Sequence, residues 1–423
     1  MTYEAPTIEQ ALDALLSGIR SLDNKEYLTL SYAAGRVLAE DIHAPFSVPS
    51  FPKSAMDGYA VRSEEVMGAS REKPVVLRVI GERLAGESGE LPVPEPFTAV
   101  RIMTGAEVPP QYDAVVREED TDYGEAEVSI FKGVTHFQNY CAVGEDIREG
   151  DVVLPAGTLI GRIETGTLAS LGFAEVPVKR RLKIRILSTG TELADPVVMS
   201  GEEAGAQGLA EGEYVPEALP PGKIFNSIAY MLEASLTAAG FEADHGIYPD
   251  DAAEIEAAVR MAAKEADVVI TTGGVSVGKK DLIPEVLGRL GADIRFRRAK
   301  IQPGTPTIGS VFEGTPVLSL SGNPYAAIVN FDIYFWPLAA KMTGCSAFLP
   351  VVEEAVLASP YEKVNAIRRL LRARVERGQV TLPAKSHASS VLSNLTACNC
   401  YLDLPAGKSI KPGDTVVIRR MPS

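Results

Sequence analysis

A glycine-rich stretch at residues 271–281, TTGGVSVGKKD, combines residue types that bind phosphate. It follows an apolar run. Two of its glycines are separated by four residues and the second precedes a lysine, which matches the start of a phosphate-loop pattern whose backbone N–H groups surround phosphates. That pattern continues with a Ser or Thr that binds Mg²⁺, but this chain has Lys280 and Asp281 there. The sequence therefore argues against an ATPase loop and leaves a plain turn and a different anion site as alternatives.

Three strand-like runs in this half of the chain each end in a glycine-containing turn. In an open parallel sheet, ligands bind beyond the carboxyl ends of the strands, where helix N-termini offer free N–H groups and a positive dipole end. A single turn of this kind is usually a connector, whereas three in one domain favour a ligand that carries phosphate. The candidate binding residues are Ser188, Thr189 and Gly190 in the first turn, Gly273, Gly274, Ser276 and Gly278 in the second, and Ser321, Gly322, Asn323 and Pro324 in the third.

Acidic residues occur beside turns and offer oxygen ligands for a metal ion. Asp281 places a carboxylate at the mouth of the glycine loop, and Mg²⁺ beside phosphates keeps several waters and few protein ligands. Asp250 and Asp281 are the candidate Mg²⁺ ligands, and Asp57, Asp146 and Glu192 are further acidic candidates. For any one of them a solvated loop carboxylate is the alternative, because exposed Asp and Glu are common.

The composition excludes several classes of partner. The chain has 423 residues, of which 46% are hydrophobic, and a net charge of −15. This charge argues against DNA or RNA, which need a basic face. Four dispersed cysteines lack zinc spacing, and the apolar stretch 324–342 is interrupted by polar residues, which favours a buried helix over a membrane span. The N-terminus lacks a signal-peptide pattern, so we expect a cytoplasmic protein. The length of the chain predicts about three domains.

The elements that would position the candidate residues fall into distinct regions. Residues 7–22 have helical spacing and a capping-box pattern, and residues 44–141 hold short β-type runs. From residue 181 strands and helices alternate, which predicts a doubly wound, mainly parallel sheet with helices on both faces. The last ~75 residues are strand-like again and predict a small β-barrel or sandwich. Residues 195–222 show little periodicity and predict an extended mobile loop.

Six segments together resemble the molybdopterin molybdenumtransferase family, of the MoeA type that also occurs as the E domain of gephyrin. They are SAMDGYAV (54–61), IMTGAEVPPQYDAVVREED (102–120), VGEDIREGDVVLPAG (143–157), ILSTGTEL (186–193), TTGGVSVGKKD (271–281) and QPGTP (302–306). The resemblance covers essentially the whole chain. It implies an elongated multidomain protomer with a linker and dimerisation domain (1–43 and 142–180), a β-rich domain (44–141), a MogA-like α/β molybdopterin-binding domain (181–344) and a C-terminal β-barrel domain (345–423).

The resemblance also implies an activity. Members of the family use Mg²⁺ to insert molybdenum from molybdate into adenylated molybdopterin with release of AMP, in molybdenum cofactor biosynthesis. It implies a homodimer with a composite active site, because the domain that carries Asp57 reaches the cleft of the other protomer. A MogA-type adenylyltransferase and molybdoenzyme maturation proteins are the implied partners, with no nucleic acid and no membrane.

Matched to the family position by position, six residues belong to catalysis or to the substrate cleft: Asp57, Thr104, Asp146, Glu192, Asp250 and Asp281. Asp57 corresponds to the key catalytic aspartate. Arg298, Pro303 and Gly304 join the residues of the glycine turns as candidates for substrate binding.

Five positions depart from the family pattern. Thr191 stands where the family has an aspartate, and Ser321 stands where it has a proline. Gln302 and Thr305 replace two lysines and Ala326 replaces a serine, at positions where the family holds phosphate and oxyanion. Two alternatives to the ordinary activity therefore stay open: a paralogue that binds molybdopterin as a carrier or scaffold without efficient insertion, and a variant that uses tungstate.

Overall fold

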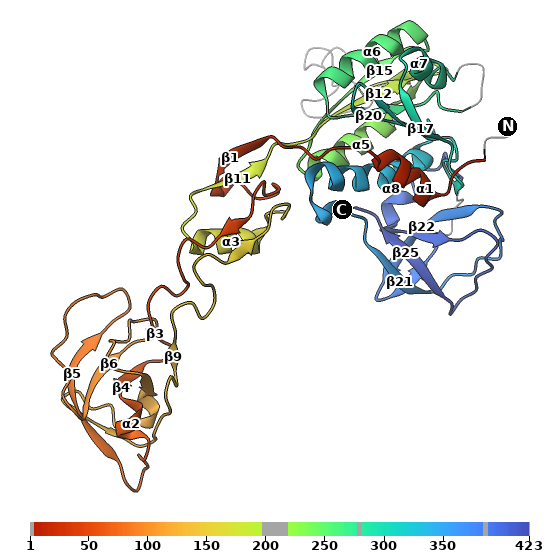
Figure 1. Cartoon of the computed structure of the whole chain (residues 1–423). Coiled ribbons are helices and arrows are strands. Elements are labelled where there is room, and N and C mark those ends of the chain that lie inside the picture. Colours follow the sequence, from red (N-terminus) through yellow and green to blue (C-terminus); the bar gives the residue numbers. More distant parts are fainter. Residues whose placement is uncertain (1–3, 197–218, 277–280, 384–387, 423) are drawn as a thin grey trace, which may run out of the picture. The chain divides into compact units, whose positions relative to one another are not determined.

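The computed structural model describes residues 4–196, 219–276, 281–383 and 388–422 and divides the chain into two compact units (Figure 1). The larger unit comprises Met1–Ala39, Gly157–Gly161 and Glu175–Ser423, and the smaller comprises Glu40–Ala156 and Arg162–Ala174. Each unit has a hydrophobic core of its own. The expected architecture of an α/β domain, a β-rich domain and a C-terminal barrel is confirmed, whereas the four exact domain boundaries stay predictions.

A six-stranded sheet forms the centre of the α/β region (Figure 1). Its strand order is β15-β12-β16-β20-β19-β17, in which the first four strands are parallel and β19 runs antiparallel to both of its neighbours. The bounds are Lys183–Thr189 for β12, Glu242–Tyr248 for β15, Val268–Thr272 for β16, Asp293–Arg297 for β17, Ile308–Phe312 for β19 and Thr315–Leu320 for β20. The doubly wound, mainly parallel sheet predicted from the alternation of elements is therefore present.

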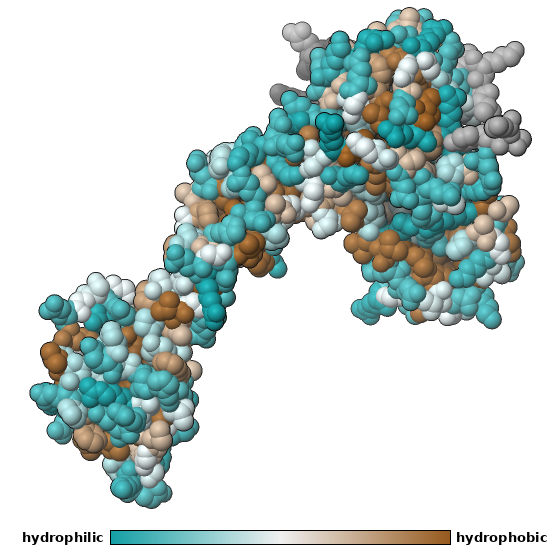
Figure 2. Space-filling view, viewed as in Figure 1, coloured by the Kyte–Doolittle hydropathy of each residue, from teal (hydrophilic) through white to brown (hydrophobic). Residues whose placement is uncertain are grey.

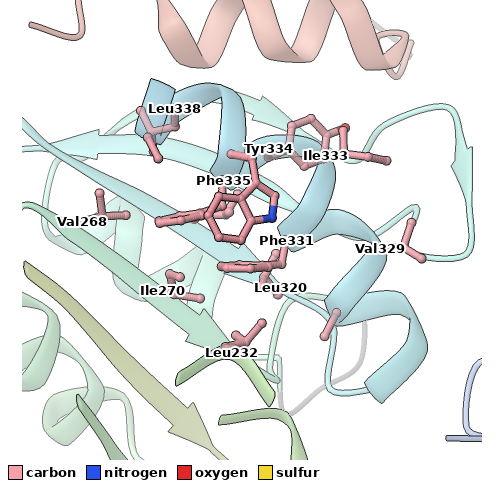
Figure 3. Packing of buried hydrophobic residues seen from close by; sticks show 14 of the residues in the cluster. Leu232, Val268, Ile270, Leu320, Val329, Phe331, Ile333, Tyr334, Phe335 and Leu338 are labelled. Atoms are coloured by element: carbon pink, nitrogen blue, oxygen red, sulfur yellow. The ribbon is translucent and has the colours of Figure 1, made fainter. Parts of the chain in front are cut away.

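Helices cover both faces of this sheet because successive side chains of a strand point to opposite faces. Val268 and Ile270 belong to a core cluster with the helices α1 (Ile8–Leu16), α5 (Ser227–Ala238) and α8 (Pro324–Thr343). Val269, between them, belongs to a second cluster with α6 (Ala252–Glu265) and α7 (Ile283–Arg289). Figure 3 shows the first cluster, with aromatic side chains of α8 packed against the strands. This double cover leaves the ends of the strands for ligands.

The C-terminal strands close into a five-stranded barrel, since β22 pairs with β23 on one side and with β24 on the other. The bounds are Val352–Leu357 for β21, Arg368–Glu376 for β22, Gln379–Thr381 for β23, Cys400–Leu404 for β24 and Thr415–Arg420 for β25. A two-residue strand, β18 (Ile301–Gln302), adds to β22 in parallel and places Gln302 opposite Arg369. The larger unit also contains the antiparallel pair β1 (Lys25–Thr29) and β11 (Glu175–Lys179).

The smaller unit is built around a five-stranded sheet of order β7-β4-β6-β5-β8. The bounds are Gly58–Val61 for β4, Val75–Arg83 for β5, Thr98–Ile102 for β6, Ala114–Arg117 for β7 and Glu127–Ile130 for β8. Two short antiparallel pairs accompany it: β2 (Ile42–His43) with β10 (Val152–Leu154), and β3 (Lys53–Ser54) with β9 (Tyr140–Cys141). The helices are α2 (Ser63–Val66) and α3 (Arg162–Ser170).

One predicted element needs correction. The helix expected over residues 7–22 is α1, which ends at Leu16, because Ser17 is extended and Gly18 has a φ of 74°. Ile19 is nevertheless buried in the same cluster as α1, and the backbone N–H of Leu22 donates to the carbonyl of Met342. Apolar spacing therefore persisted beyond the helix because an extended segment packs against the same core.

Two other expectations concern the surface. Most of the loop expected at 195–222 lies outside the described residues. Within the described ranges, no helix is long and apolar enough to cross a membrane. The 20-residue helix α8, which contains the apolar stretch, is almost wholly buried in the larger unit. On the face shown in Figure 2, hydrophobic residues form patches among hydrophilic ones.

Candidate functional site

A cavity of 460 Å³ lies at the carboxyl ends of β12, β16 and β20 in the larger unit. It brings together three carboxylates, those of Glu192, Asp250 and Asp281, although they are up to 89 positions apart in the sequence. Described residues of all three glycine turns line it: Thr189 and Gly190, Gly273, Gly274 and Ser276, and Ser321, Gly322, Asn323 and Pro324. The sheet thus gathers most of the candidate residues of this unit into one place.

Two of the glycines are required by close approach. Gly273 has a φ of 93°, and a Cβ there would lie 2.5 Å from the carbonyl oxygen of Thr189. A Cβ on Gly190 would lie 2.8 Å from the Glu192 carboxylate oxygens. Any other residue would separate the first and second turns or move Glu192, so the glycines keep the turns in contact.

The third turn leaves a side chain available to the cavity. Asn323 is the N-cap of α8 and Pro324 stands in its first turn, as the sequence predicts, but the Asn323 side chain makes no capping hydrogen bond. The Ser321 hydroxyl instead accepts a hydrogen bond from the Asn323 backbone N–H at 3.2 Å. The Asn323 amide is thus not used to stabilise the helix.

Thr191, one of the departures from the family pattern, contacts a cleft carboxylate directly. Its hydroxyl donates to Asp250 Oδ2 at 3.0 Å, and its backbone N–H lies 3.4 Å from the same oxygen. The Lys223 ammonium donates to the Thr191 carbonyl at 2.6 Å. The position therefore supplies a hydrogen-bond donor to Asp250 where an aspartate would supply a second carboxylate.

A second cavity of 370 Å³ adjoins the first, because Ser276, Ser321 and Asn323 line both. It contains the residues of the QPGTP turn, including Pro303 and Gly304, together with Ala326. The Thr305 hydroxyl donates to the Ile301 carbonyl at 2.6 Å, so its single proton is not directed at a ligand. The departures Gln302, Thr305 and Ala326 thus surround one space.

A cation in this second cavity comes from the barrel. Arg369 lines it because β18 pairs with β22 and sets Arg369 opposite Gln302. The Arg369 guanidinium donates to Asn365 Oδ1 at 3.1 Å, which uses one of its five N–H donors. Sequence reasoning missed this residue, because a β-strand arginine 63 positions after the last residue of the QPGTP turn carries no local signal of that turn.

The wall of the second cavity is fixed by a fully buried arginine. The Arg372 guanidinium stacks on the Tyr325 ring at 3.7 Å from its centroid and donates to the Ala388 carbonyl at 2.7 Å and to that of Val391. The Tyr325 backbone N–H donates to the Ser389 carbonyl at 3.1 Å. Ala388 and Ser389 are thereby held beside Arg369 as lining residues.

The candidate residues of the smaller unit form a separate arrangement. Asp57 Oδ1 accepts hydrogen bonds from the Thr104 backbone N–H at 2.7 Å and from the Thr104 hydroxyl at 2.8 Å. These bonds, the backbone one first, lower the pKa of Asp57, so its exposed carboxylate stays ionised. Asp146 instead lines an open cavity of 670 Å³ with Phe137, Tyr140 and Arg148. The structure therefore brings Asp57 and Thr104 together, whereas neither of them is among the residues that line the cavity of Asp146.

Two other candidates, Ser188 and Arg298, are not among the described residues that line either cavity of the larger unit. Ser188 is completely buried and lies beneath the first cavity, where its hydroxyl contacts Asn226 at 3.3 Å. Arg298 is exposed and is not among the lining residues of either cavity. Gly278 lies outside the described residues.

The carboxylates fit a metal ion that is held partly by substrate. Within the described ranges, no three His, Cys, Asp or Glu residues come close enough to enclose a metal by themselves. Mg²⁺ usually takes one or two carboxylates together with waters and substrate phosphates. Asp250 and Asp281, on the same cavity as the glycine turns, suit that kind of binding.

Comparison with known proteins identifies the family. Residues 6–172 match the MoeA N-terminal region (domain I and II), residues 185–341 a probable molybdopterin binding domain, and residues 354–419 the MoeA C-terminal region (domain IV). The molybdopterin molybdenumtransferases of Bacillus subtilis and Staphylococcus epidermidis are 36% and 34% identical over 402 and 394 residues, which covers 93% and 92% of this chain and 89% of each relative.

Solved structures agree with this result. The molybdopterin biosynthesis MoeA protein of Pyrococcus horikoshii OT3 has a TM-score of 0.81 at 29% identity, with 99% of this chain and 100% of that chain covered. These similarities extend over both units and the barrel. The chain therefore belongs to the molybdopterin molybdenumtransferase family, the MoeA family, as its sequence motifs predicted.

Proposed function

We propose that this protein inserts molybdenum from molybdate into adenylated molybdopterin with release of AMP, as a Mg²⁺-dependent cytoplasmic enzyme of molybdenum cofactor biosynthesis. The observation that carries the proposal is the cavity at the sheet edge, where Glu192, Asp250 and Asp281 meet three glycine turns. Backbone N–H groups at such turns bind phosphate, and nearby carboxylates suit a phosphate-bound Mg²⁺. The named activity of the curated relatives supports the same reaction.

Each group has a role in this proposal. The N–H groups of the glycine turns hold the phosphates, and Asp250 and Asp281 would hold Mg²⁺, which would neutralise charge on the phosphoanhydride as it breaks. The adjoining second cavity takes molybdate, where the Arg369 guanidinium and the hydroxyls of Ser276 and Ser389 offer donors. Because the cavities share residues, both substrates lie within one continuous site.

A composite site in a homodimer completes the proposal. The Asp57 carboxylate, kept ionised by Thr104, belongs to the smaller unit and would act on the cavity of the partner protomer. The smaller unit would thus add one catalytic carboxylate, and the larger unit would bind the substrates and hold Mg²⁺.

The test is an incubation of the purified chain with adenylated molybdopterin, Mg²⁺ and either molybdate or tungstate, followed by measurement of AMP and of cofactor. We expect AMP and cofactor with molybdate, and a loss of at least about 10²-fold in rate for Asp281→Asn, since that variant removes a charge next to the reacting phosphates. Tight binding of adenylated molybdopterin without AMP release would instead indicate a carrier. Product with tungstate alone would indicate the tungsten variant.

A further inference from the structure

The amide of Asn226 has a fixed orientation in the sheet-edge cavity. Asn226 is the N-cap of α5, is 3% exposed and lines the cavity. Its Oδ1 lies 3.4 Å from the Ala229 backbone N–H, which can only donate a hydrogen bond. The oxygen must therefore face the helix, and the amino group is the part of the amide that the helix does not use.

A chain of buried hydroxyls is compatible with this orientation, because a hydroxyl can donate or accept. The Thr272 hydroxyl donates to Ser188 Oγ at 3.1 Å, and Ser188 Oγ then donates its own proton to Asn226 Oδ1 at 3.3 Å. All three side chains are buried. Thus Oδ1 accepts two hydrogen bonds, and both N–H groups of Nδ2 are left over.

Nδ2 has no hydrogen-bond partner among the described residues, although less than 1 Å² of it is accessible. A buried donor without an acceptor costs stability, so such atoms are rare in folded proteins. For a donor in the wall of a ligand cavity, such as Asn226 Nδ2, the bound ligand would supply the missing hydrogen-bond acceptor.

The neighbours of Asn226 indicate what that ligand group is. The cavity is also lined by apolar residues that flank Asn226 in the sequence, namely Ile224, Phe225 and Ile228. Leu193, another lining residue, lies opposite Ile224 on the paired strand. An amide donor among apolar and aromatic side chains suits a planar ring that carries an acceptor, because the ring face needs apolar contact and its edge needs a hydrogen bond. The glycine turns remain for phosphate.

We infer that the Asn226 amide donates a hydrogen bond to a ring acceptor, a carbonyl oxygen or a ring nitrogen, of a planar nitrogen heterocycle, and thereby selects the substrate. This inference rests on the proposed function, in which the substrate has two such rings, the pterin and the adenine. Both offer the same acceptor chemistry, and binding measurements with the whole substrate and with AMP distinguish them.

The experiment compares the full-length protein with Asn226→Ser and Asn226→Asp by equilibrium binding of adenylated molybdopterin and of AMP. Both variants keep an oxygen that caps α5, so the fold is retained, which thermal unfolding checks. Asn226→Ser is neutral, so a loss of affinity in it is not charge repulsion. Thr7→Asp, an exchange of the N-cap of α1 away from the cavity, is the control.

We expect adenylated molybdopterin to bind about tenfold or more weakly to Asn226→Ser and more weakly still to Asn226→Asp, with Thr7→Asp unchanged. Unchanged AMP affinity in the variants assigns the contact to the pterin, and weakened AMP binding assigns it to the adenine. If Asn226→Ser binds adenylated molybdopterin as the original protein does, the inference is wrong. If the original protein does not bind adenylated molybdopterin, the proposed function fails instead.

Discussion

The Thr191 hydroxyl changes what the Asp250 carboxylate can do. In this protein Asp250 Oδ2 accepts a hydrogen bond from Thr191, whereas an aspartate at position 191 would place a second negative charge in the same part of the cavity. Mg²⁺ binds through one or two carboxylates, and each added carboxylate raises the attraction. Under the proposed function, the residue type at position 191 would therefore affect how strongly the site attracts Mg²⁺.

We predict that Thr191→Asp lowers the Mg²⁺ concentration needed for half-maximal AMP release by several-fold, because it restores a second carboxylate beside Asp250. Thr191→Val is the matched control, since it removes the hydrogen bond and adds no charge. A Mg²⁺ titration of the three proteins measures the effect. An unchanged or higher Mg²⁺ requirement in Thr191→Asp would show that this position does not act on the metal.

Arg369 is the one charged residue among the described residues that line the second cavity, where the family lysines are replaced. A hydrogen bond to a charged donor is roughly twice as strong as a neutral one. We predict that Arg369→Gln raises the molybdate concentration for half-maximal cofactor formation by about tenfold or more. Arg377→Gln, an exposed arginine beyond the other end of β22, should have no effect. If both variants need the same molybdate concentration for half-maximal cofactor formation, Arg369 does not bind the oxyanion.

The replaced lysines lead to a complementary prediction. Gln302 and Ala326 line the second cavity without charge, and the Thr305 hydroxyl is directed at the Ile301 carbonyl. Gln302→Lys, Thr305→Lys and Ala326→Ser together should lower the molybdate requirement by about tenfold, because they add two cations and a hydroxyl. The same titration measures it. If the original protein and the triple variant saturate at the same molybdate concentration, Arg369 already supplies the charge that molybdate binding needs.

At the scale of elements, local pattern predicted most of the strands and helices around the site, although it carried the first helix beyond its end at Leu16. Three of the four parallel strands, β12, β16 and β20, were recognised because each is an apolar run that ends in a glycine turn, and α8 because Asn323 and Pro324 mark its start. Arg369 could not be found in this way, because its place depends on the pairing of β18 with β22, a contact between the α/β region and the barrel. The role of Asn226 likewise could not be inferred from the sequence, because it depends on the orientation of the side-chain amide in the folded protein.

The junction between α8 and the barrel contains a buried carboxyl whose ionisation destabilises the fold. Burial raises the pKa of Asp332 to about 6, although Tyr401 donates to it at 2.6 Å and Trp336 at 3.0 Å. The stabilising effect of the neutral form is complete below pH ~4, where the unfolded carboxyl is also protonated, and is lost as the pH rises through about 6. The loss amounts to about 3 kcal/mol at most.

We predict that Asp332→Asn, which resembles the protonated carboxyl, is increasingly favoured over the original protein as the pH rises from 5 to 7. The thermal unfolding midpoint of the two proteins, measured across this range, tests the prediction. Asp13→Asn on the exposed side of α1 is the control and should show no such trend. A difference in midpoint that stays constant with pH would mean that Asp332 is already neutral, or already ionised, throughout.

At the scale of the whole molecule, the candidate residues are divided between two compact units. Asp57 and Thr104 belong to the smaller unit, while Glu192, Asp250 and Asp281 belong to the larger. The motifs of both units were evident in the sequence because each is a short contiguous segment. Whether one protomer or two complete the site depends on assembly, which no local pattern records. The resemblance to the family is the source of the composite dimer proposed above.

Mixed dimers test that assembly. If Asp57 acts on the cavity of the partner, a dimer of one Asp57→Asn protomer and one Asp281→Asn protomer has one site with both changes and one site with neither. Random mixing of the two inactive variants should then restore about a quarter of the original activity, since half of the dimers are mixed and each has one intact site. A site within one protomer predicts no recovery, because every site keeps one change. The measurement is AMP release after co-expression or after unfolding and refolding together, with each variant alone as the control. Sedimentation that shows only monomers at micromolar concentration would also contradict the composite site.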